Sequence, residues 1–280
     1  MANVQAVLSK SESGDSSVRF FQVFKGIAHT TCRWGTIPVV KVAQLDKIIN
    51  FPTELDLPWG FIRQRYGITS LGGNLISNFH CNMDHARGKV AYAINESMPE
   101  PIPSAEYYFT YAFTEPERKA LPVYYHLVQS IGCYEMGQKQ ACIEHLQGVS
   151  VHLKSVFQIY YEYIVESKDP RHVFTAYIQG FHGWAAGELI NDEYVEYDGS
   201  SGAHLVLFNA LDYFLGLEPF FHEQDFIKYF SYSQRRFMAS IKAHAFRPAA
   251  EQADNTGLVQ QFEKIAKQLR VSFHETFIIS

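Results

Sequence analysis

The sequence predicts a mainly α-helical protein, with a helical bundle that follows a smaller N-terminal segment of mixed structure. Three observations lead to this prediction. From about residue 105 onward, apolar residues recur at steps of three and four, as on amphipathic helices. Helix-start residues precede several of these runs. Before residue 105, Gly and Pro interrupt the chain too often for a long helix.

Three parts of the chain follow from this pattern. Residues 1–18 are polar and Ser-rich, and we expect a mobile N-terminus. Residues 19–104 form the smaller mixed segment, with a short strand or hairpin expected at Lys89–Ile94 and a Pro-rich loop after it. Residues 105–280 form the helical domain.

The first two helices of this domain are expected at 114–136 and 139–167. Thr114 is the expected N-cap of the first helix, with Pro116 in its first turn. The second is long and amphipathic, and its apolar stripe consists of Cys142, Leu146, Val149, Leu153, Val156, Tyr160 and Ile164.

Further helices follow toward the C-terminus. Asp169 and Pro170 are the expected cap and first residue of the next one. A Gly/Ser loop then leads into a strongly apolar helix at 203–215, and residues 225–245 form another. Asn255 or Thr256 caps the terminal helix, whose apolar stripe is Leu258, Phe262, Ile265, Leu269 and Phe273.

The composition excludes several classes of protein. Hydrophobic residues make up 47% and charged residues 19%, as in ordinary soluble globular proteins. A net charge of -5 without a basic run argues against nucleic-acid binding. No apolar run reaches the roughly 20 residues needed to span a bilayer. Without an N-terminal signal peptide we expect a cytoplasmic protein with four reduced cysteines, none in a CxxC pair. Aromatic residues, at 15%, suffice to fill a core and to line a flat pocket.

Motifs for nucleophilic catalysis and phosphate binding are missing from the sequence: it has no GxSxG, Walker or GxGxxG pattern. The stretch HCNMDH, from His80 to His85, could supply metal ligands, or its Asp84 could cap a turn. His204 follows the Gly/Ser loop and either faces what the loop covers or begins a helix. His126 lies in an aromatic-rich helix, where a hydrogen-bonded core histidine is the common reading.

His274 lies on the expected terminal helix among apolar residues, with Arg270 one turn before it. This pair suits a haem, because the imidazole can bind iron while the guanidinium meets a propionate or a carboxylate. A lone core histidine explains the same spacing.

Taken in order, four segments resemble the indoleamine 2,3-dioxygenase family of haem enzymes. They are VFTAYIQGFHGW, NDEYVEYDGSSGAHLVLFNALDYFLGL, YSQRRFM and LRVSFHETF. The family has a helix ending in GW, a GGSAG loop, a helix with an internal aspartate, a basic RR segment and a proximal haem histidine. The resemblance covers the chain from about Glu144 to its end, roughly half of it.

The resemblance implies a haem b site. It makes His274 the iron ligand and Asp212 the helix aspartate that pairs with an arginine, here Arg270. Arg235 retains a basic position of the RR segment. The mobile loop over the distal pocket corresponds to Gly199, Ser200, Ser201 and Gly202.

The distal side departs from the family pattern. Ile178 stands where the tryptophan-cleaving members carry the arginine that binds the substrate carboxylate. A neutral side chain cannot make that contact. The expected substrate-pocket residues are Phe174, Ile178, Phe181 and His182. The distal serine region corresponds to Tyr125 and His126, and the expected acid–base residues are His126, Tyr125, His80 and His204.

The resemblance therefore predicts a haem b oxygenase that uses O₂ or hydrogen peroxide to hydroxylate a small aromatic, amino-acid-derived compound, as the haem-dependent tyrosine hydroxylases of this superfamily do. Cleavage of the indole 2,3-bond is the alternative reaction. A haem sensor or carrier without turnover is an alternative of another class, and a helical interaction protein without a cofactor is a third. We expect no nucleic-acid or membrane partner, and the short N-terminal part is compatible with a homodimer.

Overall fold

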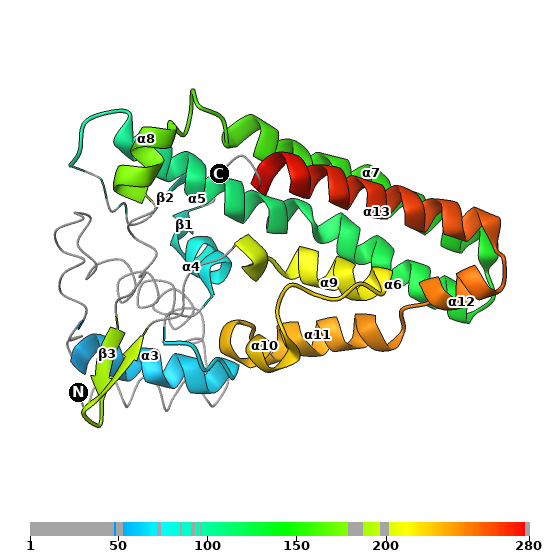
Figure 1. Ribbon diagram of the computed structural model, residues 1–280, viewed down its shortest axis with the longest axis horizontal. Coiled ribbons are helices and arrows are strands. Elements are labelled where there is room, and N and C mark those ends of the chain that lie inside the picture. The colour runs from blue at the N-terminus through cyan, green and yellow to red at the C-terminus, as the bar shows by residue number, and fades with distance from the viewer. Residues whose placement is uncertain are drawn as a thin grey trace. The chain divides into compact units, whose positions relative to one another are not determined.

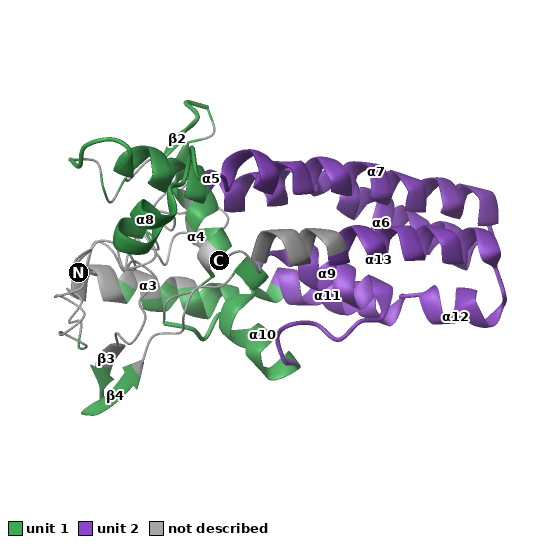
Figure 2. Cartoon of the chain, turned by 45° about the horizontal axis from the view of Figure 1, so that its top comes forward, with its two compact units in different colours: residues 1–110, 166–204, 223–232 green, residues 111–165, 205–222, 233–280 purple. Residues whose placement is uncertain are grey.

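A computed structural model describes residues 48, 53–71, 74–84, 86–90, 93, 95, 97–178, 187–196 and 202–277, with side chains of the last helix up to Arg270. The chain divides into two compact units (Figure 2). Unit 1 comprises residues 1–110, 166–204 and 223–232, and unit 2 comprises residues 111–165, 205–222 and 233–280. Both units are discontinuous in sequence, whereas the sequence pattern suggested one boundary near residue 104.

Most of the described structure is helical, as predicted. The elements that lie within unit 1 or begin there are α3 (Thr53–Tyr66), α4 (Leu75–Asn82), the first half of α5 (Ile102–Lys119), α8 (Arg171–Val173), the π-helix η2 (Phe174–Ile178), the 3₁₀ turn η4 (Gly202–His204) and α10 (Glu223–Tyr229). No described helix combines the length and the apolar character needed to cross a membrane.

Two short antiparallel hairpins also belong to unit 1. β1 (Met83–Asp84) pairs with β2 (Lys89–Val90), at the start of the predicted strand. β3 (Gly187–Ile190) pairs with β4 (Glu193–Glu196), which the sequence analysis did not predict. The turn residues Asn191 and Asp192 have φ values of 52° and 66°, and both residue types tolerate the left-handed conformation that such a tight hairpin turn requires.

Unit 2 is built from long helices, several of which lie along one another (Figures 1 and 2). They are the second half of α5, α6 (Leu121–Glu135), α7 (Lys139–Tyr163), α9 (Val206–Leu215), α11 (Tyr232–Ala243), α12 (Arg247–Gln252) and α13 (Thr256–Phe277). The predicted stripe of α7 is buried from Cys142 to Tyr160, and only Ile164, which follows the helix, is exposed.

The core of unit 2 is tied together by aromatic rings. The centroid of Phe262 on α13 lies 5.5 Å from that of Phe214 on α9 and 5.2 Å from that of Phe246, which precedes α12. All three rings are at most 3% exposed. Because each ring buries a large apolar area, these contacts hold three segments that are distant in sequence around one core.

Two predicted helix starts were wrong. Thr114 lies inside α5, where its hydroxyl donates to the carbonyl of Tyr111. The break falls instead at Ala120, and Pro122 stands in the first turn of α6, where its missing N–H removes no hydrogen bond of the helix. Asp169 makes no cap hydrogen bond to α8; the carboxylate of Glu166 accepts the Arg171 N–H at 3.2 Å instead.

One further predicted helix is divided in the structure, and the terminal helix begins where it was predicted. The predicted segment 225–245 is divided between α10 and α11. The terminal helix begins at Thr256, as predicted, and its stripe of Leu258, Phe262, Ile265 and Leu269 is buried.

The cysteines Cys133 and Cys142 are buried free thiols. The sequence analysis expected reduced cysteines.

Candidate functional site

The predicted iron ligand His274 lies on α13, within the helix that the sequence predicted. Its side chain is outside the described residues. Along a helix, steps of four and three place position 274 in line with Arg270, Lys267 and Glu263, and all three of those side chains are exposed. Arg270, the residue expected to accompany His274, therefore lies on the exposed face of α13.

The predicted ion pair between Asp212 and Arg270 is not formed. Asp212 is half-buried on α9, and burial alone raises the pKa of its carboxyl to about 7. A nearby guanidinium would lower that pKa. Arg270 is exposed on α13 and makes no ion pair with any described residue. Among the residues that the structure describes, the Asp212 carboxylate therefore has no cationic partner and the Arg270 guanidinium has no anionic one.

The predicted distal loop lies mostly outside the described residues, since only Gly202 of Gly199–Gly202 is described. Gly202 begins the turn η4, which ends at His204. His204 is 1% exposed, its ring centroid lies 4.4 Å from that of Tyr229, and its carbonyl accepts the Asn74 amide. This burial identifies His204 as a packed core residue. Arg235 is half-buried on α11.

The four predicted acid–base residues are divided between the units. His80 on α4 and His204 belong to unit 1, and Tyr125 and His126 on α6 belong to unit 2. His80 is half-buried near the end of α4.

The suggestion of a metal site in HCNMDH gains no support. Asp84 accepts the backbone N–H groups of Ala86 and Arg87, each at 3.1 Å. It therefore caps a turn, and His85 lies outside the described residues. Nowhere in the described ranges do three or more His, Cys, Asp or Glu side chains come together as a metal site.

Around His126 the structure assembles a cluster of imidazoles that the sequence analysis missed. The Nδ1 atoms of His126 and His145 are 3.0 Å apart. The ring of His152 stacks on that of His126, with centroids 5.4 Å apart and planes inclined by 21°. Tyr125 packs its ring edge-on against His126 and His145. The sequence signal was the spacing of His145 and His152, seven residues apart on one helix.

Gly148 makes room for this imidazole cluster. It lies on α7 between His145 and His152, and a Cβ added there would come within 2.5 Å of the His126 ring. His126 therefore occupies a notch on the surface of α7 that only glycine leaves open. Burial, followed by the charges of His145 and His152, lowers the pKa of His126, so its ring favours the neutral form.

The imidazole cluster faces away from the helix that carries His274. Ile143 and Ser150 on α7 contact α13: the Ile143 side chain reaches Gly257, and Ser150 exchanges hydrogen bonds with Gln268. At about 100° per residue, the face with Ile143 and Ser150 is roughly opposite the face with His145, Gly148 and His152. The geometry of unit 2 therefore gives no support to an acid–base role for Tyr125 and His126 opposite His274.

Of the predicted substrate-pocket residues that are described, Ile178 is a core residue and Phe174 is half-buried. Ile178 is 1% exposed, and Phe174 packs against Phe109 with ring centroids 5.2 Å apart. Phe181 and His182 lie outside the described residues.

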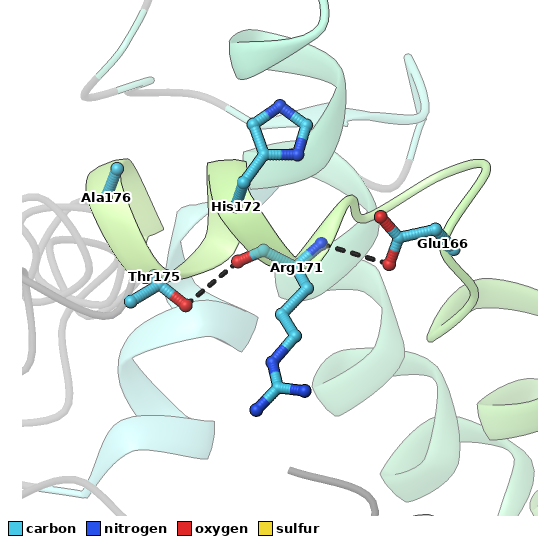
Figure 3. A pocket seen from close by; sticks show the side chains of 5 residues that line it. All are labelled: Glu166, Arg171, His172, Thr175 and Ala176. Carbon is cyan, nitrogen blue, oxygen red and sulfur yellow. Dashed lines mark hydrogen bonds between the residues drawn. The ribbon is translucent and has the colours of Figure 1, made fainter.

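Other residues of the same segment line a surface depression of about 560 Å³ (Figure 3). The lining residues are Glu166, Arg171, His172, Thr175 and Ala176, all exposed. The imidazole of His172 and the guanidinium of Arg171 point in different directions (Figure 3). Such an open hollow without converging groups is unlike the enclosed apolar pocket that holds a small aromatic molecule.

A half-buried polar cluster in unit 2 also escaped the sequence analysis. Glu117 accepts the Tyr124 hydroxyl at 2.6 Å and the Leu207 N–H at 3.2 Å. The second contact satisfies the N-terminus of α9. Burial raises the pKa of Glu117 and that of Tyr124 and Tyr160 beside it. No local pattern marks these residues, because only packing brings α5, α6, α7 and α9 together.

No family model matches the sequence. No curated protein is similar enough to it to count as a relative.

Proposed function

We propose that this protein is a haem b-dependent oxygenase that hydroxylates a small aromatic, amino-acid-derived compound. His274 would bind the iron. Support comes from the ordered motifs of the C-terminal half and from the helical bundle of unit 2, in which His274 lies on the long helix α13.

The observation that carries the proposal is the pairing of position 274 with Arg270. Arg270 lies one turn before His274, exposed, and has no ion-pair partner in the described part of the chain. A haem placed on His274 would bring propionate groups near this helix, and a guanidinium binds such a carboxylate in a bidentate manner. The group fits these residues because an imidazole can ligate the iron and an exposed guanidinium lies one turn before it on the same helix.

The chemistry belongs to the haem, which when bound supplies activation of O₂ or peroxide. The protein's share is to ligate the iron through His274, to fix the haem through Arg270 and to hold the substrate away from water. In the peroxide route, one oxygen atom enters the ring, the displaced hydrogen stays on the product hydroxyl, and the other oxygen leaves as water.

Ring hydroxylation is favoured over cleavage of the indole 2,3-bond by the position of Ile178. It stands where the cleaving enzymes of the resembled family carry an arginine, and here it is buried at 1% exposure. A buried aliphatic side chain can neither reach nor pair with a substrate carboxylate.

An absorption spectrum of the purified protein titrated with haemin tests the ligation. The parent should give a strong Soret band, His274→Ala should lose or shift it, and His222→Ala, which changes an exposed histidine of unit 2, should leave it unchanged. Arg270→Ala should keep the band but weaken haem affinity by about tenfold, or ~1.4 kcal/mol. A parent spectrum identical to that of free haemin would overturn the proposal.

A second experiment separates an oxygenase from a haem sensor or carrier. The haem-loaded protein is incubated with tyrosine or tryptophan, and with O₂ plus a reductant or with peroxide, and products are identified by mass. Gain of one oxygen atom supports hydroxylation, and gain of two supports ring cleavage. A six-coordinate, low-spin iron with no product from any of these mixtures would identify a sensor or carrier instead.

A further inference from the structure

The Nδ1 atoms of His126 and His145 are close enough together to bind one metal ion. Their Nδ1 atoms are 3.0 Å apart, and both side chains are half-buried on the helix pair α6–α7. Imidazole nitrogens bind a divalent transition metal at about 2.0–2.1 Å. Two nitrogens 3.0 Å apart therefore subtend an angle of roughly 95° at a shared metal ion.

This angle distinguishes between metals. It is close to the right angle between neighbouring ligands in square-planar or tetragonal sites and well short of the tetrahedral angle that zinc prefers. Copper(II) and nickel(II) favour the former geometry, and copper(II) binds nitrogen ligands most tightly of the divalent first-row metals.

The surroundings hold the pair in place. His126 is enclosed by Gly148 beneath it, the stacked ring of His152 and the edge of Tyr125. His145 is fixed on a continuous helix, in contact with the ring of Tyr125. Since less side-chain freedom is lost on binding, a pair that packing already orients binds a metal more tightly than two mobile surface histidines.

We propose that His126 and His145 form a binding site for a divalent transition-metal ion that favours tetragonal coordination, and that copper(II) is the ion bound most tightly. The ion replaces the hydrogen bond between the two rings, each ring then carries its proton on Nε2, and water molecules complete the coordination. His152 and Tyr125 orient the pair. This site is independent of the proposed haem, because it lies on the face of α7 opposite α13.

Copper(II) titration of the full-length protein, followed by calorimetry and electron paramagnetic resonance, tests the site. The parent should bind one equivalent with a spectrum of nitrogen ligation. The double variant H126A/H145A should lose this equivalent or weaken it by at least about tenfold, ~1.4 kcal/mol. His222→Ala is the control for the loss of a histidine elsewhere on the surface, and circular dichroism checks that each variant is folded. Zinc should bind more weakly than copper.

A variant of the notch gives a second, independent test. Gly148→Ala places a methyl group where the His126 ring lies, so it should weaken copper binding without removing a ligand. Gly132→Ala on α6 is the matched control, because nothing lies within 4 Å of its added Cβ. Copper binding that is equal in the parent and H126A/H145A would overturn the proposal, and so would the absence of the nitrogen signal from the parent.

Discussion

Helices α6 and α7 take part in two half-buried polar clusters that differ in their partners. Glu117 and Tyr124 are joined by a hydrogen bond of 2.6 Å, and the same carboxylate holds the N-terminus of α9. His126 and His145 are joined by a contact of 3.0 Å on the half-exposed side of α6–α7. Tyr124 and His126 are only two residues apart, so the helix directs them to different surroundings.

The difference separates a structural cluster from a candidate binding site. The Glu117 carboxylate is committed to a hydroxyl and to a helix terminus, and its removal leaves buried donors without an acceptor. The imidazole pair shares one hydrogen bond near solvent, where water can replace a lost partner. We therefore expect the first cluster to control stability and the second to control ligand binding.

The largest effect on stability is expected from Glu117→Ala. It removes the acceptor of the Tyr124 hydroxyl and of the Leu207 N–H, and it should lower the free energy of unfolding by about 2–4 kcal/mol. Urea denaturation measures this change. Glu135→Ala is the control, because Glu135 pairs with His244 on the surface and its loss should cost roughly 0–1 kcal/mol. Equal effects of the two variants would contradict the distinction between the clusters.

The second prediction concerns Asp212, whose carboxyl has no cationic partner among the described residues and whose ionisation should lower the free energy of unfolding. Burial raises its pKa from 3.8 to about 7, so the folded state holds this proton more tightly than the unfolded chain. This contribution to stability is complete below about pH 4 and is lost as the pH rises through about 7. Asp212→Asn should therefore stabilise the apo protein at about pH 8, by on the order of 1–2 kcal/mol, and change little at about pH 4. Thermal unfolding at the two pH values measures it; a loss of stability at about pH 8 instead would show that the carboxylate is paired.

A comparison of two glycines refines the description of the notch. Gly132→Ala on α6 should raise the free energy of unfolding by about 0.5–1 kcal/mol, because alanine favours a helix and meets no atom there. Gly148→Ala should gain less, since the added methyl group displaces the His126 ring. Chemical denaturation of both variants measures the difference. Equal gains would mean that His126 leaves the notch without cost.

The smallest effect is expected from His126→Ala in the absence of metal. The side chain is half-buried, and its single side-chain hydrogen bond to His145 and its stacking on His152 lie near solvent, so its loss should cost less than about 1 kcal/mol. Denaturation of the metal-free protein measures it. A loss as large as that of Glu117→Ala would assign the imidazole cluster to the core and not to a binding surface.

Local pattern predicted the helices well where one face is buried along the whole element. Six of the seven residues predicted for the stripe of α7 are buried, and so are four of the five predicted for α13, because the helical period repeats over many turns. The side chain of the fifth, Phe273, is outside the described residues. Boundaries were less predictable. Thr114 has the chemistry of a cap, but the apolar residues before it continue the helix, so tertiary packing outweighed the local signal.

The candidate sites were less predictable than the helices. His274 and Arg270 could be placed on one face from spacing alone, yet whether that face is buried depended on which side of α13 packs against the rest of unit 2. The expected pair of Asp212 and Arg270 likewise required a contact between two helices, and α9 and α13 do not bring these side chains together.

By itself, then, the sequence determined the helical class, the long amphipathic helices and the residue types available for ligation, since these depend on periodicity and composition. The tertiary structure alone decided which polar groups meet: Glu117 with Tyr124 and α9, and His126 with His145 over Gly148. The physical reason is that such contacts join elements 7 to 90 residues apart in the chain. Their energies depend on burial and geometry, which no local pattern of residues encodes.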